Sequence, residues 1–205
     1  MSGPPLTSAF WDERFGGDAY FYGTAPNDFL AEAAAHLPPQ RRVLSLGEGE
    51  GRNAVHLASL GHTVVAVDGS ASGRAKALRL AEARGVSLEY IVADLAAWSP
   101  PGEFDAVVSI FCHLPSALRH RVHRALWQAL PPGGLFILEA YRPEQIPLGT
   151  GGPKDADMLV TLADLRQDFP GARERVAVEH RRTVVEGTGH TGPAEVVDAV
   201  FEKTA

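Results

Sequence analysis

The chain has 205 residues, of which 45% are hydrophobic and 21% are charged, and its formal net charge at pH 7 is −6. A chain of this length and composition can bury a sizeable core, and we expect one globular domain over residues 1–205. The acidic balance disfavours nucleic acid as the main partner, because nucleic-acid binding usually shows as a basic stripe. No apolar run reaches the length of a membrane span, and the first residues lack the charged and apolar regions of a signal peptide.

The single cysteine, Cys112, has no partner for a disulfide within the chain, so a reducing, cytoplasmic location is expected. We expect Cys112 to be a small buried residue and not a nucleophile. The spacing of cysteine and histidine shows no structural zinc pattern, and no metal site is predicted.

The N-terminal arm, residues 1–25, carries a cluster of aromatic side chains, namely Phe10, Trp11, Phe15, Tyr20, Phe21 and Tyr22. Two interpretations of this arm are open. It packs on the domain as a structural arm, or it forms a lid that stacks on a planar ligand. As a lid it would bring Arg14 to a carboxylate and Tyr22 to a cofactor, with Tyr20 beside the substrate.

Helical spacing begins after Asn27, a candidate N-cap, and ends at Pro38. Apolar strand patterns then alternate with helical patterns. Strands are predicted at residues 43–46, 63–67, 88–93, 104–110 and 135–140, and helices at 52–60, 71–84, 115–130 and 161–169. This alternation predicts an α/β fold, a Rossmann-like doubly wound sheet with right-handed crossovers.

The alternation stops after Tyr141. Residues 143–157 form a loop that leaves the carboxyl edge of the predicted sheet, and we expect it on the substrate side. Two β patterns, at 175–186 and 194–202, are joined by the glycine-rich residues 187–193. They predict an antiparallel hairpin within residues 172–205.

The first predicted strand runs into a turn with glycine at alternate positions, Gly47, Gly49 and Gly51, and glutamate between them, Glu48 and Glu50. A strand-to-helix turn of this kind holds nucleotide-like ligands in doubly wound folds. Two carboxylates would repel a pyrophosphate but would tolerate a ligand with a positive charge, such as the sulfonium of S-adenosylmethionine. The turn therefore favours a cationic nucleoside cofactor, although a tight turn without ligand is the structural alternative.

Acidic residues close the next two strands. Asp68 follows Gly47 by 21 residues, the separation at which a carboxylate meets ribose hydroxyls, and Asp94 ends the third strand. Ligands of open α/β sheets bind beyond the carboxyl ends of the strands, so the glycine turn and both aspartates are expected at one site. Each aspartate alone is more often a helix cap or a loop residue.

Four segments in order, residues 44–53, 67–70, 93–95 and 130–134, resemble the motifs of class I S-adenosylmethionine-dependent methyltransferases. Residues 11–15 and 22–27 resemble the small bacterial tellurite-resistance/thiopurine-methyltransferase-like group. That family has a seven-stranded sheet, mostly parallel, with an antiparallel last strand. Two departures from its pattern are Ser45, where many members carry an acid, and Glu48, where many carry Cys or Ala.

The resemblance implies that Gly47, Gly49 and Gly51 approach the methionine part of the cofactor. It implies that Asp68 takes the ribose hydroxyls and that Asp94 and Leu95 frame the adenine. The remaining candidates for cofactor binding are Arg14, Tyr22, Glu48, Asn53, Gly69 and Ser109.

Candidate residues on the acceptor side follow later strands at the same sheet edge. His113 and His190 are the candidate catalytic residues, because a base is needed if the acceptor must lose a proton. Tyr141 and Lys154, together with Tyr20, are candidate substrate contacts. The structural alternative is that His113 only precedes a helix and that His190 is a turn residue.

The leading hypothesis is methyl transfer from S-adenosylmethionine to a small acceptor, which the family resemblance suggests is a thiol or a chalcogen oxyanion. The alternative is a non-catalytic nucleoside-binding module that keeps the fold. A nicotinamide dehydrogenase is disfavoured by the spacing of the three glycines and by Glu48 and Glu50.

Overall fold

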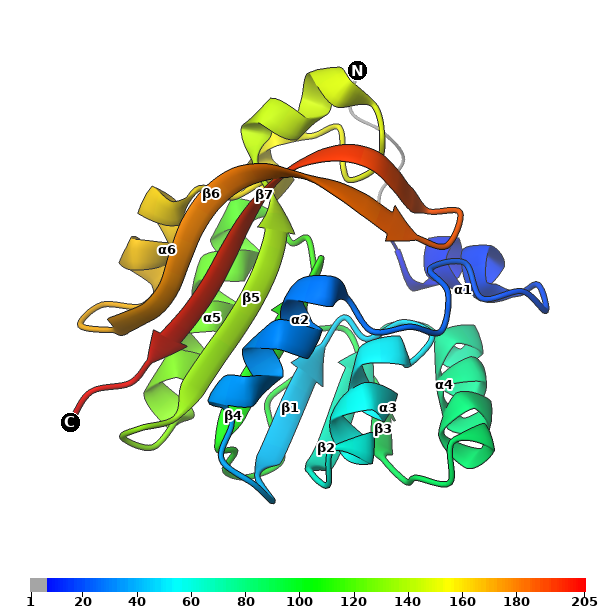
Figure 1. Ribbon diagram of the computed structural model, residues 1–205, viewed down its shortest axis with the longest axis horizontal. Helices are drawn as coiled ribbons and strands as arrows, with labels where there is room; N and C mark the ends of the chain where they lie inside the picture. The colour runs from blue at the N-terminus through cyan, green and yellow to red at the C-terminus, as the bar shows by residue number, and fades with distance from the viewer. Residues whose placement is uncertain (1–6) are drawn as a thin grey trace.

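The computed structural model describes residues 7–205, and Figure 1 shows the arrangement of its elements. Within these residues the sheet consists of β1 (Arg42–Leu46), β2 (Thr63–Asp68), β3 (Glu89–Val92), β4 (Ala106–Ile110), β5 (Leu135–Tyr141), β6 (Arg173–Glu186) and β7 (His190–Glu202). The strand order is β3-β2-β1-β4-β5-β7-β6, and only the two pairs that involve β7 are antiparallel. The predicted seven-stranded, mostly parallel sheet with an antiparallel C-terminal strand is confirmed.

The α-helices of the described chain are α1 (Ser8–Phe15), α2 (Asp28–Ala33), α3 (Arg52–Ser59), α4 (Ala71–Ala83), α5 (Ser116–Ala129) and α6 (Leu162–Asp168). Short 3-10 helices follow as η1 (Ala34–His36), η2 (Pro143–Leu148) and η3 (Ala156–Met158). The predicted N-cap is confirmed, since the Asn27 side chain accepts from the backbone N–H of Leu30. The sequence pattern does not predict α1, which has little apolar periodicity and is held by contacts with α4.

Strand β1 lies between β2 and β4, so the chain runs from β1 to one side of the sheet and later returns to the other side. In doubly wound folds this reversal leaves a crevice beyond the carboxyl ends of the strands. The residues that follow β1 and β4 therefore lie at the place where such a sheet holds a ligand.

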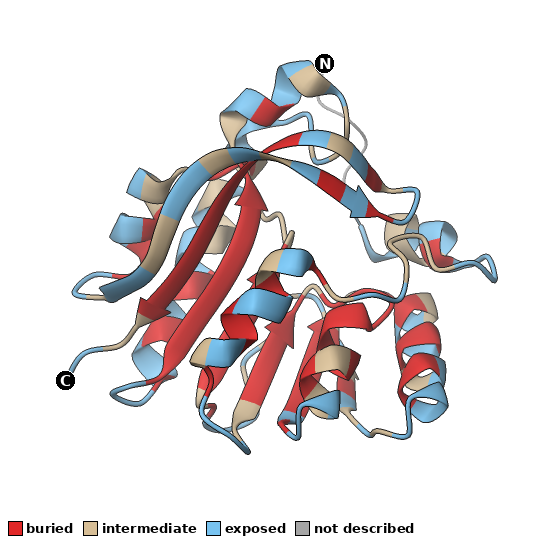
Figure 2. Ribbon diagram, in the orientation of Figure 1, coloured by how far each residue is buried: buried red, intermediate tan, exposed pale blue. Residues whose placement is uncertain are grey.

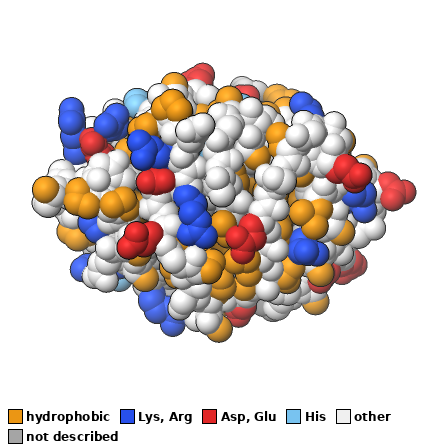
Figure 3. All heavy atoms as spheres, turned by 90° about the horizontal axis from the view of Figure 1, so that it is seen from below, with side chains coloured by type: hydrophobic (Ala, Val, Ile, Leu, Met, Phe, Trp, Pro, Cys, Tyr) orange, Lys and Arg blue, Asp and Glu red, His pale blue; other side chains and the backbone are white. Residues whose placement is uncertain are grey.

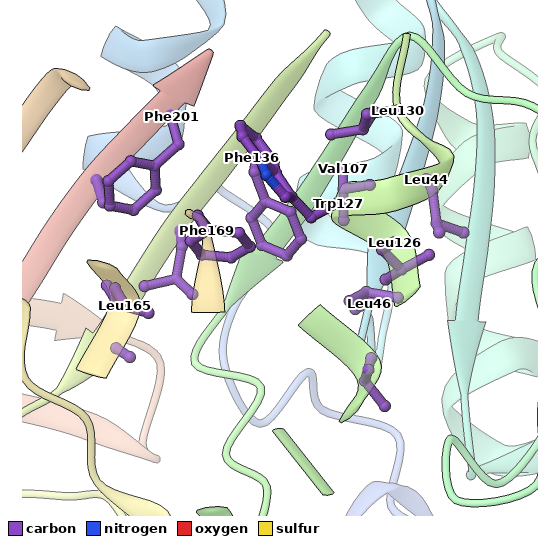
Figure 4. Packing of buried hydrophobic residues seen from close by; sticks show 14 of the residues in the cluster. Leu44, Leu46, Val107, Leu126, Trp127, Leu130, Phe136, Leu165, Phe169 and Phe201 are labelled. Carbon is purple, nitrogen blue, oxygen red and sulfur yellow. The ribbon is translucent and has the colours of Figure 1, made fainter. Parts of the chain in front are cut away.

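Alternate residues of each strand face opposite layers of helices. Leu44, Val107 and Phe136 pack toward α5 and α6 in the larger core cluster, and Figure 4 shows the rings and leucines that fill it. Val43 and Val108 face the other way, toward α2 and α3. Figure 2 shows the result: β1, β2, β4, β5 and β7 are buried along most of their length, the edge strand β6 is mostly exposed or intermediate, and the helices are buried on their inner sides. Each fully buried aliphatic or aromatic side chain contributes about 1.5–3 kcal/mol to this sandwich.

Helix α6 is tied to α5 by a buried carboxylate. Asp168 accepts hydrogen bonds from Arg119 Nε at 3.1 Å, His120 Nδ1 at 2.6 Å and His123 Nδ1 at 2.8 Å. Although burial raises the pKa of Asp168, the hydrogen bond and charge of His123, with His120 and Arg119, hold it below its usual range. The carboxylate therefore stays ionised among these three donors, which we call the Asp168 cluster.

The C-terminal hairpin departs from the prediction at its turn. The turn was expected over residues 187–193, but β7 begins at His190, and Glu186 pairs directly with His190 across a three-residue loop. The glycines on either side of His190 weaken the strand pattern, and pairing with β6 overrides this weak propensity. Because β6 is antiparallel to β7, it runs parallel to β5, and its turn lies at the carboxyl edge of the sheet.

The hairpin tip reaches the N-terminal arm. Thr188 donates its backbone N–H to the carbonyl of Phe21 at 2.9 Å, and Gly187 lies against residues 21–23. Figure 1 shows the two strands curving over the carboxyl edge toward this segment. Segments from the two ends of the described chain therefore meet above the glycine turn.

Figure 3 shows the molecule from below, where Lys and Arg side chains alternate with Asp and Glu and form no continuous stretch of one sign. A nucleic-acid surface normally concentrates positive charge, so this face lacks that signature. Among residues 7–205, no helix combines the length and apolar character needed to cross a bilayer.

Candidate active site

The glycine turn connects β1 to α3 through backbone conformations that favour glycine. Gly47, Gly49 and Gly51 all have positive φ angles, of 59°, 59° and 94°. A Cβ on Gly47 would lie 2.7 Å from the sulfur of Cys112, and one on Gly51 would lie 2.5 Å from the Cβ of Ala77. The turn therefore needs glycine at these two positions both for its conformation and for the close approach of neighbouring segments.

Glu48 is buried and serves the turn itself. Its carboxylate accepts from the backbone N–H groups of Asn53 at 3.1 Å and Ala54 at 2.9 Å, in the first turn of α3, and from the Ser45 hydroxyl at 2.5 Å. Burial raises the pKa of Glu48 to about 7, against the lowering effect of these hydrogen bonds. Ser45 and Glu48, the two departures from the family pattern, are thus hydrogen-bonded to each other.

Glu50 does not face the ligand crevice, contrary to the expectation that both glutamates of the turn would. Its carboxylate lies 2.7 Å from Lys76 Nζ, and both side chains are only 2% exposed. It also accepts from the backbone N–H of Phe21 at 2.7 Å and that of Tyr22 at 3.3 Å. Lys76 on α4 neutralises Glu50, because a buried carboxylate is stable only when it is paired. The hydrogen bonds from Phe21 and Tyr22 let Glu50 anchor the arm.

The two strand-end aspartates differ in exposure. Asp68 accepts one backbone N–H on each oxygen, from Gly49 at 3.0 Å and from Ser70 at 2.8 Å, and burial raises its pKa. Asp94 is exposed and accepts from the backbone N–H of Ala96 at 2.8 Å, while Leu95 packs against the larger core cluster. Each Asp68 oxygen keeps a further lone pair that a hydroxyl could use.

These features can be tested against the needs of a nucleoside cofactor. The glycine turn offers a backbone surface without side chains, Asp68 offers free lone pairs for ribose hydroxyls, and Asp94 with Leu95 offers a polar and an apolar edge at the next strand end. These residues therefore fit a nucleoside cofactor. Asn53 and Gly69 are more structural, since Asn53 Oδ1 accepts from the Asn27 backbone at 2.9 Å and Gly69 lies under Ser8 of α1.

The segment that follows β4 is strained. Phe111 has a φ of 52°, a conformation that costs a bulky residue about 1–2 kcal/mol. Such strain persists where the surrounding structure fixes it, often at functional sites. Buried Ser109 precedes it on β4. Cys112 follows it with its sulfur against Gly47 and is partly buried, less than the sequence predicts. Desolvation raises the pKa of its thiol to about 12, so the thiol is protonated and the environment does not favour a nucleophile.

Five rings gather at this segment, from four separate parts of the chain. This ring cluster consists of Tyr22, Phe111, His113, Tyr141 and His190. His113 stacks on Tyr141 with centroids 5.5 Å apart and planes 8° apart, and His190 lies 4.6 Å from Tyr22 and 4.7 Å from Phe111. The structure thus brings together both predicted catalytic histidines and the predicted substrate contact Tyr141. Burial raises the pKa of the Tyr141 hydroxyl, which stays protonated.

The protonation of His113 follows from its partner. Its Nδ1 lies 3.3 Å from the carbonyl oxygen of Met158, and a carbonyl only accepts, so Nδ1 carries the proton. Nε2 is then an unprotonated acceptor, and it is buried without a hydrogen-bond partner among the described residues. Burial, followed by the charge of His190, lowers the pKa of His113 to about 3. His113 is therefore a neutral acceptor of hydrogen bonds.

Other predicted contacts lie elsewhere. Tyr20 donates its hydroxyl to the Lys76 carbonyl at 3.0 Å and packs beside Val55 between α3 and α4, so the structure does not bring it into the ring cluster. Lys154 is exposed on the loop whose glycines, Gly151 and Gly152, lie against Tyr141. The exposed Arg14 places its guanidinium 4.7 Å from the Phe21 ring.

The aromatic arm packs on the glycine turn, as the first of its two interpretations expects. Phe15 is buried with its ring against Gly49, and Asp12 accepts from the Ser70 hydroxyl at 2.7 Å. Burial raises the pKa of Tyr22, against a hydrogen bond from Arg14. The described part of the arm, residues 7–25, therefore forms one wall of the crevice; residues 1–6 of the predicted arm lie outside the described residues.

Sequence reasoning missed a buried polar network behind the ring cluster. Glu139 on β5 is fully buried and accepts from Arg182 Nε at 2.7 Å and Nη2 at 3.0 Å, as well as from Asn27. Burial raises the pKa of Glu139 to about 7. Glu186 accepts from Asn27 Nδ2 at 2.8 Å and from Arg52 Nη2 at 2.6 Å. The one available signal was Glu139, a single charge inside an otherwise apolar strand pattern.

Comparison with known proteins identifies the fold around this site. Residues 43–134 match the family model described as a methyltransferase domain. Over these residues the chain is similar to methyltransferase domains. This match confirms the resemblance to S-adenosylmethionine-dependent methyltransferases that the ordered motifs predict.

Among curated proteins, the tRNA 5-carboxymethoxyuridine methyltransferase of Escherichia coli (strain K12) is 35% identical over 117 residues, which are 55% of this chain and 45% of that protein. The chain thus spans about half the length of the curated relatives it matches.

Two solved structures share the fold over nearly the whole chain. TehB from Haemophilus influenzae has a TM-score of 0.73 at 17% identity, covering 96% of this chain and 67% of that one. The N-methyltransferase NodS from Bradyrhizobium japonicum WM9, in complex with S-adenosyl-l-homocysteine, has a TM-score of 0.74 at 13% identity, covering 98% and 100%. Both likenesses show a shared fold.

Proposed function

We propose that the protein transfers a methyl group from S-adenosylmethionine to a small acceptor that binds at the ring cluster. The observation that carries the proposal is the meeting of the glycine turn, Asp68 and the ring cluster at one edge of the sheet. When bound, the cofactor supplies a methyl group on a positively charged sulfur, which is already activated for displacement. The protein then has to hold the acceptor in line, an effect that can contribute about 7–11 kcal/mol.

The proposed cofactor contacts follow the order of the strand ends. Gly47, Gly49 and Gly51 would lie along the methionine part, Asp68 would accept from the ribose hydroxyls, and Asp94 with Leu95 would border the adenine. Glu48 and Asn53 would act indirectly by holding the turn, because their polar atoms are engaged within the protein. Gly69, Ser109, Arg14 and Tyr22 stay predicted cofactor contacts.

The charges near the ring cluster favour one of the two acceptor types. Two cations near the ring cluster, the buried Arg52 and the partly buried Arg182, are already paired, with Glu186 at 2.6 Å and with Glu139 at 2.7 Å. Arg14, the third cation near the cluster, is exposed to water. A desolvated oxyanion needs a cation of its own, whereas a neutral thiol gains favourable contacts between sulfur and aromatic rings. We therefore favour a thiol over a chalcogen oxyanion.

The curated relative named above acts on tRNA, and this chain spans less than half of that protein. The net charge of −6 is unfavourable for binding a polyanion. We therefore propose a small-molecule acceptor that binds between the arm, as one wall, and residues 143–157, as the second wall. A cytoplasmic location stays a prediction from the single cysteine.

The experiment combines binding with turnover. Calorimetric titration should show that the wild type binds S-adenosylhomocysteine. Asp68→Ala should weaken this binding at least about tenfold, because it removes one charge-assisted hydrogen bond. The control Glu82→Ala, at an exposed position, should bind as the wild type does. Labelled S-adenosylmethionine is then offered with thiols, chalcogen oxyanions, phenols and tRNA. Labelled product with thiols supports the proposal, labelled tRNA overturns the acceptor class, and binding without any turnover supports the non-catalytic alternative.

A further inference from the structure

Glu186 and His190 face each other across the hairpin beside the ring cluster. They are the last residue of β6 and the first residue of β7, and they form a directly paired position in the sheet register. Glu186 Oε2 lies 3.3 Å from His190 Nδ1, and both residues are buried. The carboxylate is therefore placed to control one nitrogen of the imidazole ring.

The carboxylate itself is held firmly from the other side of the crevice. Arg52, the first residue of α3, donates to Oε2 at 2.6 Å, and Asn27, the N-cap of α2, donates to Oε1 at 2.8 Å. Burial alone would raise the pKa of Glu186, but the hydrogen bond from His190 and the charge of Arg52 lower it to about 2. Glu186 is thus ionised at neutral pH and can only accept hydrogen bonds.

The tautomer of His190 follows from this geometry. Because Glu186 only accepts, Nδ1 of His190 carries the proton and the lone pair is on Nε2. The ring lies among Tyr22, Phe111 and Tyr141, at centroid distances of 4.6, 4.7 and 5.3 Å. Nε2 is the ring nitrogen that does not contact Glu186, so it is the one that can meet an acceptor bound at the ring cluster.

The charged and titratable groups around His190 come from every element packed against it. They are Glu186 on β6, Arg52 on α3, Arg14 and Tyr22 in the arm, Tyr141 on β5 and His113 after β4. Burial lowers the pKa of His190, while Glu186 acts in the opposite direction. The ring is neutral and able to take a proton, and the adjacent carboxylate would then stabilise the imidazolium.

We infer that His190 is the base that removes the acceptor's proton and that Glu186, held by Arg52, is its positioning residue. The inference rests on the proposed function. The lone pair on His190 Nε2 takes the thiol proton, and the S–H electron pair stays on the acceptor sulfur. That pair forms the new S–CH₃ bond as the methyl leaves the donor sulfonium, which departs as a neutral thioether.

The two histidines of the ring cluster then have different roles. His113 has a carbonyl as its Nδ1 partner and no carboxylate to stabilise a second proton. Its free Nε2 would accept a hydrogen bond only from a second donor group of the acceptor molecule, because the single S–H proton goes to His190. His190 alone has the ionic partner that a proton carrier needs.

The test uses acceptors that differ in acidity. With an alkyl thiol, whose pKa is about 8.5, His190→Gln should lower kcat/KM by about 10²–10⁴-fold. With an acidic aryl thiol that is already ionised at the assay pH, the same variant should lose less than about tenfold, because no proton has to be removed. Glu186→Gln should show the same dependence on the acceptor with a smaller loss. His120→Gln, which changes a matched histidine–carboxylate pair between α5 and α6, should behave as wild type.

A readout independent of turnover is ¹⁵N NMR of the histidine rings. We expect the Nδ1–H tautomer of His190, and a lower pKa of its ring in Glu186→Gln, with S-adenosylhomocysteine binding retained as the folding check. Equal losses on both thiols, or a proton on Nε2, overturn the inference. If the wild type methylates no acceptor, the proposed function fails. The tautomer of His190 and the change of its pKa in Glu186→Gln then still test whether Glu186 positions the His190 ring.

Discussion

Replacing Lys76 with methionine removes the cation that neutralises Glu50 beneath the N-terminal arm. The two side chains are 2.7 Å apart and 2% exposed, so water cannot replace the lost partner. Lys76 Nζ also donates to the Ala19 carbonyl at 2.6 Å, and Glu50 accepts from the backbone of Phe21. The substitution therefore leaves a buried carboxylate unpaired and frees the arm from α4.

The expected cost is about 3–5 kcal/mol of unfolding free energy, the usual effect of removing one partner of a buried ion pair. For a chain of this size, each kcal/mol lowers Tm by about 2–4 °C, so Tm should fall by about 6–20 °C. The double variant Lys76→Met/Glu50→Gln removes both charges, while the glutamine oxygen can still accept from the arm. It should recover most of the loss, because two neutral partners have no desolvation penalty of this kind.

Urea denaturation followed by far-UV circular dichroism measures these differences, and trypsin cleavage after Arg14 reports whether the arm has been released. Arg79→Met is the matched control, since Arg79 is an exposed cation on the same helix, and it should change stability by no more than about 0.5 kcal/mol. A loss below about 1 kcal/mol for Lys76→Met would refute the reasoning. So would weaker cofactor binding in Glu50→Gln with unchanged stability, because that result would place Glu50 at the ligand.

Further predictions concern the glycine turn and the Asp168 cluster between α5 and α6. Gly51→Ala should lower the unfolding free energy by more than about 3 kcal/mol in denaturation experiments, because the new Cβ overlaps Ala77 and the φ of the residue is 94°. The control Gly61→Ala has a similar φ of 88° but open space around its Cβ, so it should cost about 1–2 kcal/mol. Equal losses in the two variants would contradict this account. Glu48 has its pKa raised to about 7, so its ionisation opposes folding and the wild type should lose stability as the pH rises from about 4 to about 7. Glu48→Gln should lose about 3 kcal/mol less over that range, and parallel stability curves would refute the assignment. Asp168→Asn should cost about 3 kcal/mol or more at pH 7, because the Asp168 cluster loses its anion, and the difference from wild type should shrink below pH 4 as the carboxylate is protonated.

The fold could be predicted because its signals are local. Alternating apolar strands and helices specify a parallel sheet with both faces covered, since the hydrophobic period of each segment determines its type. The start of α2 was predictable because a cap is a contact between residues three apart, Asn27 and Leu30. Helix α1 was not, since its stability comes from packing on α4 rather than from its own pattern.

The same distinction between local signals and long-range contacts applies to the candidate site. The order of the glycine turn, Asp68 and Asp94 depends only on strands that end at one edge, so the sequence by itself determined the proposed donor side. The acceptor side depends on contacts between residues far apart in the chain: Glu50 is neutralised by Lys76, His190 is paired in β7 with Glu186, and Arg52 closes the group. Only the tertiary structure decided these partners, because the direction of a charged side chain is set by the counter-charge that folding brings beside it, and no local pattern encodes that neighbour.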